Sequence, residues 1–481
     1  MIGENNPKLT KSDFLLFCEA PRHLWAKRNG RIDRQPSDFD RHIKNQGYVV
    51  ESLARDYLET VFLPANPGAD LFWQRTYSDS PFEARVDALI YWPDSDQYDL
   101  YEIKSATGTD KKDIYDVAFQ SLVLKSQLDL RRCYVLHLNK EYIQFEDTDL
   151  AQLFIAEDVT EKVFSLLPDI AELRRGALQA AGAADPLGLP HCLAPKECPC
   201  PAVCHPDLPE FSIFDIPRLG QKKKVELLEM GIRDAAMIPA DFDLNAIQRL
   251  VVERARTRRE HIDRRALRDK LEGLQFPLWF LDYETCILAV PHYPGYRPQQ
   301  QVVFQYSLHC LSEPDSSPQH AGHVALCEGD PSLELLEHLM ADLGGSGNVV
   351  VWNKTFEMTM NKEMARLHPE YEEFLADLNA RVFDLAEVVN AGIYLHPGFK
   401  GSWSIKNVLP VMVPELSYLD LPIHKGDQAS MAWWAITFGN LEVAQRDILR
   451  VDLERYCALD TLAMVEIYRK LRVLPESGAT S

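Results

Sequence analysis

Long apolar runs are missing from this chain of 481 residues. No stretch approaches the roughly 20 consecutive apolar residues that a membrane-spanning helix needs. The opening residues, MIGENNPKLTKSDF, also lack the apolar core of a secretory signal. These absences argue against membrane-embedded and secreted classes and predict a cytoplasmic protein with no membrane partner. Apolar residues still make up 46% of the sequence, so buried cores are expected, and the length fits two or three domains.

An excess of positive charge is lacking as well, because 72 acidic residues against 51 Lys and Arg give a formal net charge of −21. This balance argues against a protein that coats nucleic acid by electrostatic attraction alone. It permits an enzyme with a local basic groove that gathers carboxylates where divalent cations bind. One basic run, residues 253–270, carries eight Lys and Arg against four acidic residues. We interpret it as a solvated connecting helix, with a phosphate-contacting surface as the alternative.

Internal repeats and low-complexity tracts are absent too, so domain boundaries are placed where the residue pattern changes. Residues 1–209 mix helical and strand-like patterns and end in a stretch rich in Ala, Gly, Pro and Cys. Residues 210–275 predict short helices joined by a Gly-Ile turn, as in helix-hairpin modules. Residues 276–481 begin with predicted strands at 277–285, 302–311 and 348–353. The predicted fold class is α/β, with two catalytic-type domains and a helical connector.

Charged residues gather on two predicted neighbouring strands of the first domain. The segment ARVDALIYWPDSDQYDLYEIKSAT predicts strands over 83–92 and 98–105 with a tight turn between them. Alternate residues of a strand share a face, so Glu102 and Lys104 project together, and Asp87 can lie beside them. Carboxylates hold a divalent cation that activates water, and a lysine steadies developing charge, so this set suits phosphodiester hydrolysis.

Predicted helices of the same domain bring further polar residues. Helices are predicted over residues 11–27, 43–60 and 113–128, and a further strand over 132–138. Glu51 lies on the second of these helices and is a possible further ligand. Asp116 and Gln120 lie four residues apart on the third helix, and therefore on one face of it.

These segments, together with LTKSDFLLFCEAPRHLW and AFQSLVL, resemble the PD-(D/E)xK nucleases of the RecB type, including CRISPR-adaptation nucleases that carry an iron–sulfur cluster. The resemblance covers roughly residues 9–204. It implies three metal ligands, one catalytic lysine and one substrate-side residue, in that order: Glu51, Asp87, Glu102, Lys104 and Gln120. Two features depart from the family: Leu124 stands where a Tyr is expected, and His42 lies earlier than the usual His. An inactive binding relic is therefore the alternative to an active nuclease.

Ten cysteines are present, and four of them crowd into HCLAPKECPCPAVCHP, at Cys192, Cys198, Cys200 and Cys204. In a chain with no recognisable secretion signal, this crowding indicates metal binding rather than a disulfide framework. Four thiolates suit either a [4Fe–4S] cluster or a tetrahedral Zn²⁺ ion. The RecB-type resemblance implies the iron–sulfur cluster, held by Cys18 and three of these cysteines, Cys192, Cys198 and Cys204, with Cys200 as a substitute. Such a centre would pin the first helix to the end of the domain, so that metal binding contributes to folding.

Carboxylates recur in the last domain, on segments far apart in the sequence. The apolar strand FLDYET ends with Asp282 and Glu284 on one face, and burying two acids is costly unless a cation neutralises them. VVVWNKTFEM brings Glu357, and the amphipathic helix ERYCALDTLAMVEIYRKL places Tyr456 and Asp460 on one face. Four carboxylates can hold two divalent ions, one activating water and the other the leaving oxygen, while Tyr456 orients the water.

These motifs, in this order, resemble the DEDDy branch of the DnaQ-like 3′→5′ exonucleases, which are built on an RNase H-like sheet. The resemblance covers about residues 276–471, and GSWSIKNVLP resembles a helix start that the family has between its second and third motifs. One departure is Glu357, where the family has Asp. Asp384, in VFDLAEVV, is a nearby acid that can support the site. The pairing of the two domains resembles bacterial proteins that fuse a RecB-type nuclease to an RNase H-like exonuclease.

The sequence therefore predicts a metal-dependent nuclease that uses Mg²⁺ or Mn²⁺ to hydrolyse phosphodiester bonds, in genome maintenance or defence. Nucleic acid is the expected partner, and DNA with single-stranded ends the expected substrate, because the RecB-type resemblance favours DNA. One alternative is a nucleic-acid-binding or scaffold protein with one inactive centre, which the departures at Leu124 and Glu357 motivate. Another is an RNA-trimming 3′→5′ exonuclease.

Overall fold

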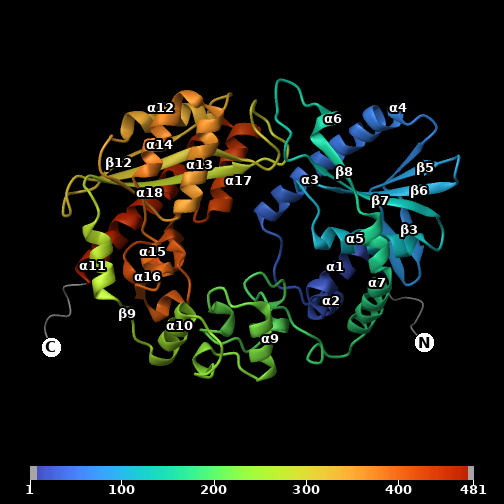
Figure 1. Cartoon of the computed structure of the whole chain (residues 1–481), viewed down its shortest axis with the longest axis horizontal. Coiled ribbons are helices and arrows are strands. Elements are labelled where there is room, and N and C mark those ends of the chain that lie inside the picture. Colours follow the sequence, from blue (N-terminus) through green and yellow to red (C-terminus); the bar gives the residue numbers. More distant parts are fainter. Residues whose placement is uncertain (1–7, 475–481) are drawn as a thin grey trace. The chain divides into compact units, whose positions relative to one another are not determined.

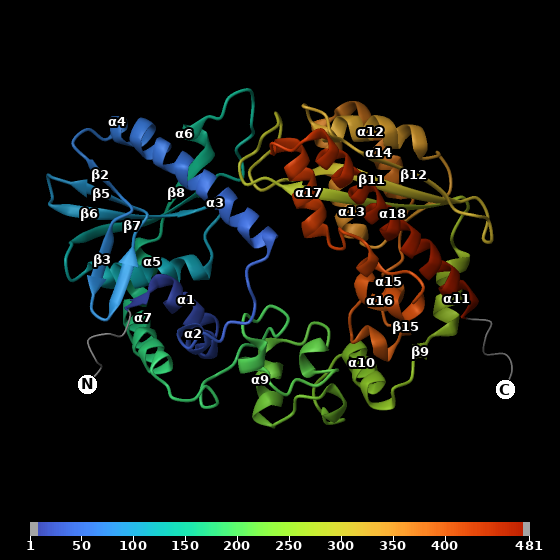
Figure 2. The ribbon, with the colours of Figure 1, turned by 180° about the vertical axis from the view of Figure 1, so that it is seen from behind.

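The computed structural model describes residues 8–474, and the chain divides into two compact units (Figures 1 and 2). Unit 1 consists of Met1–Asp207 and Leu288–Gln300, and unit 2 of Leu208–Ile287 and Gln301–Ser481. The segment 210–275 thus belongs to the same unit as the C-terminal strands. The mixed sheets and many helices give the α/β class that the sequence predicted. Within the described residues, no helix has the length and apolar character needed to cross a membrane.

The main sheet of unit 1 has five strands in the order β2-β5-β6-β7-β8. These strands are β2 (Asp70–Trp73), β5 (Ala88–Trp92), β6 (Gln97–Lys104), β7 (Leu130–Leu138) and β8 (Phe154–Asp158). β6 and β7 run parallel, and the other neighbours are antiparallel. A smaller sheet contains β1 (Leu9–Thr10), β4 (Phe82–Arg85) and β3 (Thr76–Asp79), in that order. The C-terminal end of β6 carries Glu102 and Lys104.

Helices cover both faces of the main sheet of unit 1, as Figure 1 shows. They are α3 (Asp38–Tyr57), α5 (Lys111–Leu124) and α7 (Thr160–Ala181). Leu89 and Leu100 are buried in the core that α5 and α7 share. Their chain neighbours Ile90 and Tyr101 are buried in a second core against α3. This alternation follows from the two-residue period of a strand, and it explains why both faces of β5 and β6 are apolar.

Two predicted elements of unit 1 are each divided in the structure. The predicted helix 11–27 is two helices, α1 (Lys11–Glu19) and α2 (Pro21–Arg28), separated by the extended residue Ala20. A residue before proline is disfavoured in the helical region, which accounts for the break. The predicted strand 83–92 is also two strands, β4 and β5, which lie in different sheets. Asp87 falls between them.

The sheet of unit 2 has five strands in the order β12-β11-β10-β13-β14. The strands are β10 (Leu278–Ile287), β11 (Gln301–Leu311), β12 (Gln319–Val324), β13 (Asn348–Val351) and β14 (Val382–Asp384). β11 is antiparallel to both of its neighbours, whereas β10, β13 and β14 run parallel. β10, β11 and β13 correspond to the three predicted strands. Two strands of this sheet were not predicted from the sequence: β12, a polar edge strand, and β14, which is three residues long.

Two groups of helices cover the two faces of the unit 2 sheet. They are α12 (Pro331–Asp342), α13 (Lys354–Leu367) and α14 (Glu372–Ala380) on one face, and α17 (Gly426–Phe438) and α18 (Val443–Val473) on the other. Leu281 and Tyr283 of β10 are buried with residues of the first group. Phe280, which points the other way, has its ring centroid 5.9 Å from that of Tyr468 on α18. The predicted C-terminal amphipathic helix lies within α18.

The connector is helical but interrupted. It contains α9 (Gln221–Glu229), α10 (Ala246–Thr257), the short strand β9 (His261–Ile262) and α11 (Arg264–Glu272). The predicted Gly-Ile turn follows α9, where Gly231 has a φ of +74° that favours glycine. The basic run is therefore not one continuous helix, because Arg258 ends α10 in the left-handed conformation. Arg254 donates to the carbonyl of Glu260 at 2.9 Å, so part of the basic run stabilises the fold.

The segment Leu288–Gln300 packs within unit 1, although it follows β10 and precedes β11 in the sequence. Ala289 and Val290 join the core against α3. The backbone N–H of Ala289 donates to Gln46 Oε1 at 2.6 Å. Gln299 Nε2 donates to the carbonyl oxygen of Ser105, the residue after β6, at 2.6 Å. This segment therefore contributes to the fold beside the end of β6.

Candidate functional site

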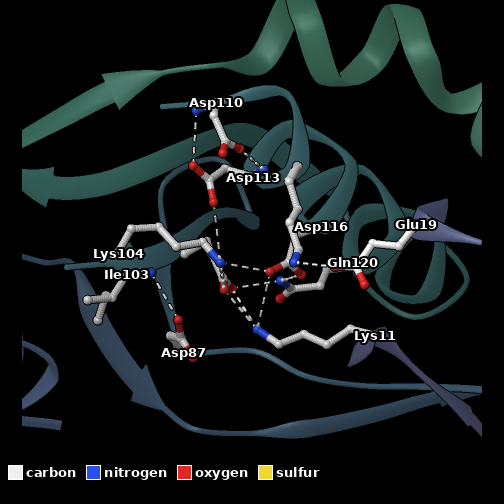
Figure 3. Close-up of polar contacts among 11 residues, drawn as sticks. Lys11, Glu19, Asp87, Ile103, Lys104, Asp110, Asp113, Asp116 and Gln120 are labelled. Atoms are coloured by element: carbon white, nitrogen blue, oxygen red, sulfur yellow. Dashed lines mark hydrogen bonds and ion pairs between the residues drawn. The ribbon is translucent and has the colours of Figure 1, made fainter. Parts of the chain in front are cut away.

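Glu102 is the centre of a buried polar network at the end of β6 in unit 1. Figure 3 labels its partners Lys11, Lys104 and Gln120. Lys11 Nζ donates to both carboxylate oxygens of Glu102, at 2.8 and 3.0 Å. Lys104 Nζ donates to Glu102 Oε1 at 2.9 Å, and Gln120 Nε2 donates to Oε2 at 2.6 Å. Three donors from α1, β6 and α5 therefore converge on a single carboxylate.

Asp116 is the second carboxylate of this network, and it lies on α5 one turn before Gln120. Lys104 Nζ donates to Asp116 Oδ2 at 2.9 Å, and Gln120 Nε2 to Oδ1 at 2.8 Å. Asp87 Oδ2 accepts from the backbone N–H of Ile103, the residue after Glu102, at 2.9 Å. The structure thus brings together four of the predicted residues of this centre, Asp87, Glu102, Lys104 and Gln120.

The pKa values divide these acids into two groups. Burial alone would raise the pKa of Glu102, but Lys11 and Lys104 beside it lower the value to about 2. Burial and the nearby Glu102 charge raise the pKa of Asp87 to about 8. The same two causes raise the pKa of Asp116 to about 6. At neutral pH Glu102 is therefore ionised and paired, whereas Asp87 is largely protonated.

Glu51 reaches this centre only through another side chain. It lies on α3 and accepts a hydrogen bond from the Gln74 side chain. The backbone N–H of Gln74 in turn donates to the carbonyl oxygen of Asp87 at 2.8 Å. Gln74 has a φ of +49°, so this bridging residue is held in an unusual conformation. His42, on the same helix as Glu51, is buried and lies 2.9 Å from Gln46 Nε2 through its Nε2.

Sequence reasoning missed Lys11 as a member of this centre. It is separated from Glu102 by 91 positions, and no strand or helix period connects the two residues. Its place is set by the capping box of α1, in which Thr10 and Asp13 fix the first turn. The signal available in the sequence was the segment TKSD at the predicted helix start, which indicates a cap and not a catalytic partner.

In unit 2, Asp282 and Glu284 lie on the face of β10 that α18 covers. They pair across the sheet with Ser307 and Gln305 of β11. The Ser307 and Thr461 hydroxyls are 2.7 Å apart, and Gln305 Nε2 donates to the Leu453 carbonyl at 2.9 Å. These contacts hold α18 against the sheet at the level of the two acids, and α18 carries the remaining residues of the predicted motif.

Tyr456, Cys457 and Asp460 of α18 meet the acids of β10. Ligand atoms of Asp282, Glu284 and Cys457 all lie within 4.8 Å of one another. Asp460 accepts from the Tyr418 hydroxyl at 2.5 Å. Asp460 is close enough to Asp282 and Glu284 for its charge to raise the pKa values of both, so three of the four predicted carboxylates of this centre are neighbours.

Glu357, the fourth predicted acid, enters from α13. This helix begins at the cap residue Asn353, and Tyr283 of β10 ties it to the sheet by donating to Asn361 Oδ1 at 2.9 Å. Glu357 is only 2% exposed, and its Oε2 has no hydrogen-bond partner among the described residues. Burial, and then the charges of Asp282 and Glu284, raise its pKa well above the usual value. The four acids thus form one interacting set.

The other three acids show the same electrostatic pattern. Burial and Asp460 raise the pKa of Asp282, and burial with Asp282 and then Asp460 raises that of Glu284. Burial raises the pKa of Asp460 to about 6, against the effect of the Tyr418 hydrogen bond and of Lys406. Raised values mean that the protein itself supplies too little positive charge for these carboxylates.

Lys406 and Tyr418 are the residues of this centre that the sequence did not identify. Lys406 Nζ donates to the Tyr456 hydroxyl at 2.9 Å and lies over the Tyr418 ring, 5.6 Å from its centroid. Lys406 belongs to the segment GSWSIKNVLP, which the motif comparison did highlight. Tyr418 follows no recognisable motif. Both residues reach the centre from outside the strands and helices that carry the four acids.

Asp384, predicted as a supporting acid, has a local role in the fold. Its Oδ2 accepts from the backbone N–H of Lys354 at 3.2 Å, and its Oδ1 accepts from that of Ala386 at 3.0 Å. Lys354 is the first residue of α13, so Asp384 joins the end of β14 to the helix that carries Glu357. Asp384 therefore affects the centre indirectly, by holding the helix that carries Glu357.

The donor set of unit 2 fits divalent metal ions such as Mg²⁺ or Mn²⁺. Oxygen donors are those that both ions prefer, and one carboxylate oxygen of Glu357 is buried without a partner. Cations at these four carboxylates would stabilise their charged forms and would relieve the repulsion that, after burial, raises the pKa values of Asp282, Glu284 and Glu357. When bound, such ions supply polarisation of a phosphate and activation of water.

The cysteines near the end of unit 1 gather as predicted, but with a different fourth residue. The ligand atoms of His23, Cys192, Cys198 and Cys204 lie within 4.8 Å of one another, and all four residues are buried. Cys198 Sγ lies 3.5 Å from His23 Nε2. The structure therefore contains a set of donors that can bind a metal ion.

The prediction that Cys18 is the N-terminal ligand is wrong. It is exposed on α1, whereas His23, on α2, faces the cysteines. The break at Ala20 turns the two helices in different directions. Arg22 then fixes α2 against the cysteine segment, because it donates to the carbonyls of Leu189 at 2.8 Å and Val203 at 3.1 Å.

Cys200 and His205 add two further donors at the rim of this set. Cys200 Sγ lies 3.8 Å from Cys204 Sγ, and both thiols are buried. His205 Nε2 lies 3.1 Å from Cys192 Sγ. The site thus has more potential ligands than the four that a tetrahedral ion requires.

Comparison with known proteins gives two similarities. The model of a domain of unknown function, DUF2779, matches residues 279–404, which include Asp282, Glu284 and Glu357 but not Lys406 or Asp460. A solved structure described as the crystal structure of SSO0001 is similar at 13% sequence identity, over 44% of this chain and 90% of that chain, with a TM-score of 0.26. No curated protein matches the chain significantly.

Proposed function

We propose that the chain is a metal-dependent nuclease that hydrolyses phosphodiester bonds of DNA at single-stranded ends, in genome maintenance or defence. The observation that carries this proposal is the convergence of Asp282, Glu284, Glu357 and Asp460, with raised pKa values and one unpartnered buried oxygen. Buried acids without counterions are costly in a purely structural role, and they are what a two-cation centre uses. The order of these motifs, which resembles that of the DEDDy exonucleases, supports a 3′→5′ exonuclease on an RNase H-like sheet.

Each residue of the unit 2 centre has a role in this proposal. The four carboxylates would hold Mg²⁺ or Mn²⁺. Tyr456 would orient the attacking water, and Lys406, 2.9 Å from the Tyr456 hydroxyl, keeps that hydroxyl in place. The same ammonium group lies beside the acids without neutralising them, so it can also attract a phosphate. Cys457 fills the space between α18 and Asp282.

A specific observation in unit 1 favours a second candidate function there. The resemblance to RecB-type nucleases supports DNA cleavage by Asp87, Glu102 and Lys104. In the structure, however, Glu102 is already paired with two lysines, Lys11 at 2.8 Å and Lys104 at 2.9 Å. A metal ion would have to displace Lys11 to reach this carboxylate. The second candidate is therefore that unit 1 binds nucleic acid without cleaving it and that unit 2 cleaves.

For the cysteine site we propose a single Zn²⁺ ion, where the RecB-type resemblance implies a [4Fe–4S] cluster. Zn–S bonds of about 2.3 Å in a tetrahedron place neighbouring sulfurs about 3.8 Å apart, which a donor set within 4.8 Å can satisfy. The thiolates of a cubane bind iron atoms at different corners and lie farther apart. Anaerobically purified protein is expected to contain zinc and to lack visible absorption. Iron with visible absorption would instead establish the cluster.

The proposed activity is tested with end-labelled single- and double-stranded DNA and RNA, in Mg²⁺ or Mn²⁺. Asp282→Asn and Asp460→Asn are expected to lower the rate at least about 100-fold, because each removes a ligand on which the charge stabilisation depends. Asp447→Asn, on the exposed side of α18, is the matched control and should retain the wild-type rate. Retention of the wild-type rate in the two site variants would refute the proposed centre.

Asp87→Asn tests the cleavage role of unit 1. Because Asp87 is largely protonated at neutral pH, Asn replaces it with little change in charge, and the fold should persist. Asp56→Asn, on the exposed side of α3, is the control. A loss of cleavage in Asp87→Asn alone would assign cleavage to unit 1. Preference for RNA, with Asp87→Asn fully active, would instead indicate an RNA-trimming exonuclease.

A further inference from the structure

Metal-binding side chains also meet at the edge of the unit 2 sheet, away from the four carboxylates. His323 lies on the edge strand β12 and pairs across the sheet with Tyr306, which in turn pairs with Tyr283. Paired residues share a face of a sheet, so His323 points to the side covered by α12. Asp282 and Glu284, which flank Tyr283 in the sequence, point to the opposite side. The His323 locus is therefore distinct from the candidate nuclease centre.

Two residues of α12 complete this locus. His323 Nε2 lies 2.7 Å from Glu334 Oε1. The His338 ring stacks on the His323 ring, with the centroids 3.8 Å apart and the planes inclined by 15°. One ligand atom of each of His323, Glu334 and His338 lies within 4.8 Å of the others. Stacked rings cannot both direct an in-plane nitrogen at one ion, so the exposed His338 ring has to turn out of the stack to bind an ion together with His323.

A thiol beside Glu334 can supply a fourth donor of the kind that zinc accepts. It lies outside the three residues whose ligand atoms are within 4.8 Å of one another, and its sulfur is 3.5 Å from the Gly329 carbonyl oxygen. Cys327 lies in the short connection between β12 and α12, and burial together with the neighbouring Glu334 raises its pKa to about 11. The donors thus follow the local spacing His-x3-Cys-x6-Glu-x3-His, in which Glu334 and His338 are one helical turn apart. Closely spaced nitrogen, sulfur and oxygen donors of this kind suit a tetrahedral ion.

The connection that presents these donors is held in place from several sides. The backbone N–H of Ala325 donates to the Phe304 carbonyl at 2.8 Å, and the Trp433 indole donates to the Ala325 carbonyl at 2.9 Å. Asp330 caps α12 by accepting from the backbone N–H of Ser332 at 3.0 Å. The backbone that carries the donors is therefore fixed, and binding an ion requires only side-chain movements, chiefly of the His338 ring.

We propose that His323, Glu334 and His338 bind a divalent transition-metal ion of the zinc class, with Cys327 as the fourth ligand. Two imidazoles, one carboxylate and one thiolate match the ligand types of zinc better than those of magnesium or calcium. With all four positions filled by protein, the ion has a structural role and joins the edge strand β12 to α12. This site stands independently of any nuclease activity.

Hydrogen exchange in the full chain tests this site separately from every other metal site. Protein stripped of metal by a chelator is compared with and without one added equivalent of Zn²⁺ beyond the unit 1 site. We expect Zn²⁺ to slow exchange at least about tenfold in residues 319–342 of the wild-type chain. We expect no such protection in the double variant His323→Gln/His338→Gln. Glu337→Gln, which removes an exposed charge next to His338 but no ligand, is the control and should keep the protection.

Two further measurements keep the proposal open to refutation if the double variant folds poorly. His338→Gln alone changes an exposed residue, and it should lower the affinity for Zn²⁺ at this site at least about tenfold in competition with a chromophoric chelator. With Co²⁺ as the probe, Cys327→Ser should reduce the thiolate-to-cobalt absorption by the share of one sulfur. Equal Zn²⁺ protection of residues 319–342 in wild type and His338→Gln, or no protection in either, would overturn the proposal.

Discussion

Glu102, at the end of β6 in unit 1, and the acids on β10 in unit 2 have pKa values shifted in opposite directions. In unit 1, Lys11 and Lys104 neutralise Glu102 and hold its pKa at about 2. In unit 2, Lys406 lowers the pKa values of Asp282, Glu284 and Asp460, but burial outweighs this effect and raises the pKa of Asp460 to about 6. Glu102 is therefore neutralised without a metal ion, although Asp87 and Asp116 beside it have raised pKa values. In unit 2 all four acids have raised values.

A similar motif can therefore be stabilising or destabilising, according to the cations that the fold supplies. A carboxylate with its own ammonium partners contributes to stability, and a metal ion must compete with those partners. A carboxylate without them lowers the stability of the metal-free protein, and it gains most from a cation. Unit 2 should therefore depend on metal for stability as well as for activity.

The largest expected effect is the loss of stability on removing the unit 1 carboxylate. Glu102→Gln leaves Lys11 and Lys104 without their main counterion in a half-buried site. Breaking a buried pair in this way should lower the free energy of unfolding of unit 1 by about 3–5 kcal/mol. Chemical denaturation followed by hydrogen exchange in β6 and α5 measures this change. Glu83→Gln, which breaks the exposed pair with Lys8, should cost at most about 1 kcal/mol.

The corresponding change in unit 2 should have the opposite sign. Asp282→Asn removes one of the mutually repelling acids, so the metal-free protein should gain on the order of 1–2 kcal/mol in the stability of unit 2. The same variant should lose most of the stabilisation that Mg²⁺ or Mn²⁺ gives to the wild type. Thermal unfolding with and without metal reports both effects. If metal-free Asp282→Asn is instead less stable than the wild type, repulsion among the unit 2 acids does not lower the stability of unit 2.

Glu102 and Asp460 should change the stability of their units with pH in opposite directions, whereas Asp87 and Asp116 should act on unit 1 in the same sense as Asp460 acts on unit 2. Asp460 has a raised pKa in the folded state, so metal-free unit 2 should lose stability as pH rises from about 4 to about 6. Glu102 has a lowered pKa, so unit 1 should lose stability as pH falls from about 4.5 to about 2. Exchange rates in α18 and β6, followed over this range, separate the two trends. Added Mg²⁺ should abolish the loss in α18 at pH 7.

A smaller effect is expected on the affinity of unit 1 for a metal ion when one of its two lysines is removed. Lys11→Met removes one of the two ammonium partners of Glu102, so the affinity of unit 1 for Mn²⁺ should rise several-fold. The measurement is made in an Asp282→Asn background, in which binding to unit 2 is weakened. Lys8→Met, which removes an exposed lysine near the start of the same helix, is the matched control. Unchanged affinity in Lys11→Met would show that Lys11 is no barrier to metal.

Local patterns in the sequence identified most strands of both sheets and the acids that they carry. Asp282 and Glu284 were predictable because two acids interrupt an apolar strand, and Glu102 and Lys104 because strand alternation joins them. Lys11, Lys406 and Tyr418 were not predictable, because they reach their centres through tertiary packing that no local period records. The exchange of Cys18 for His23 has a similar origin. A two-helix break at Ala20 decides which side chain faces the cysteines.

The segment Leu288–Gln300 belongs to unit 1, yet about eighty residues of unit 2 precede it in the chain. Unit 1 therefore cannot finish folding on the ribosome when its first 207 residues have emerged, since Ala289 and Val290 are still missing from its core. A fragment that ends near residue 209 would leave an apolar surface on α3 uncovered and would be prone to aggregate. Unit 1 can therefore complete its core only after the first segment of unit 2 has been synthesised.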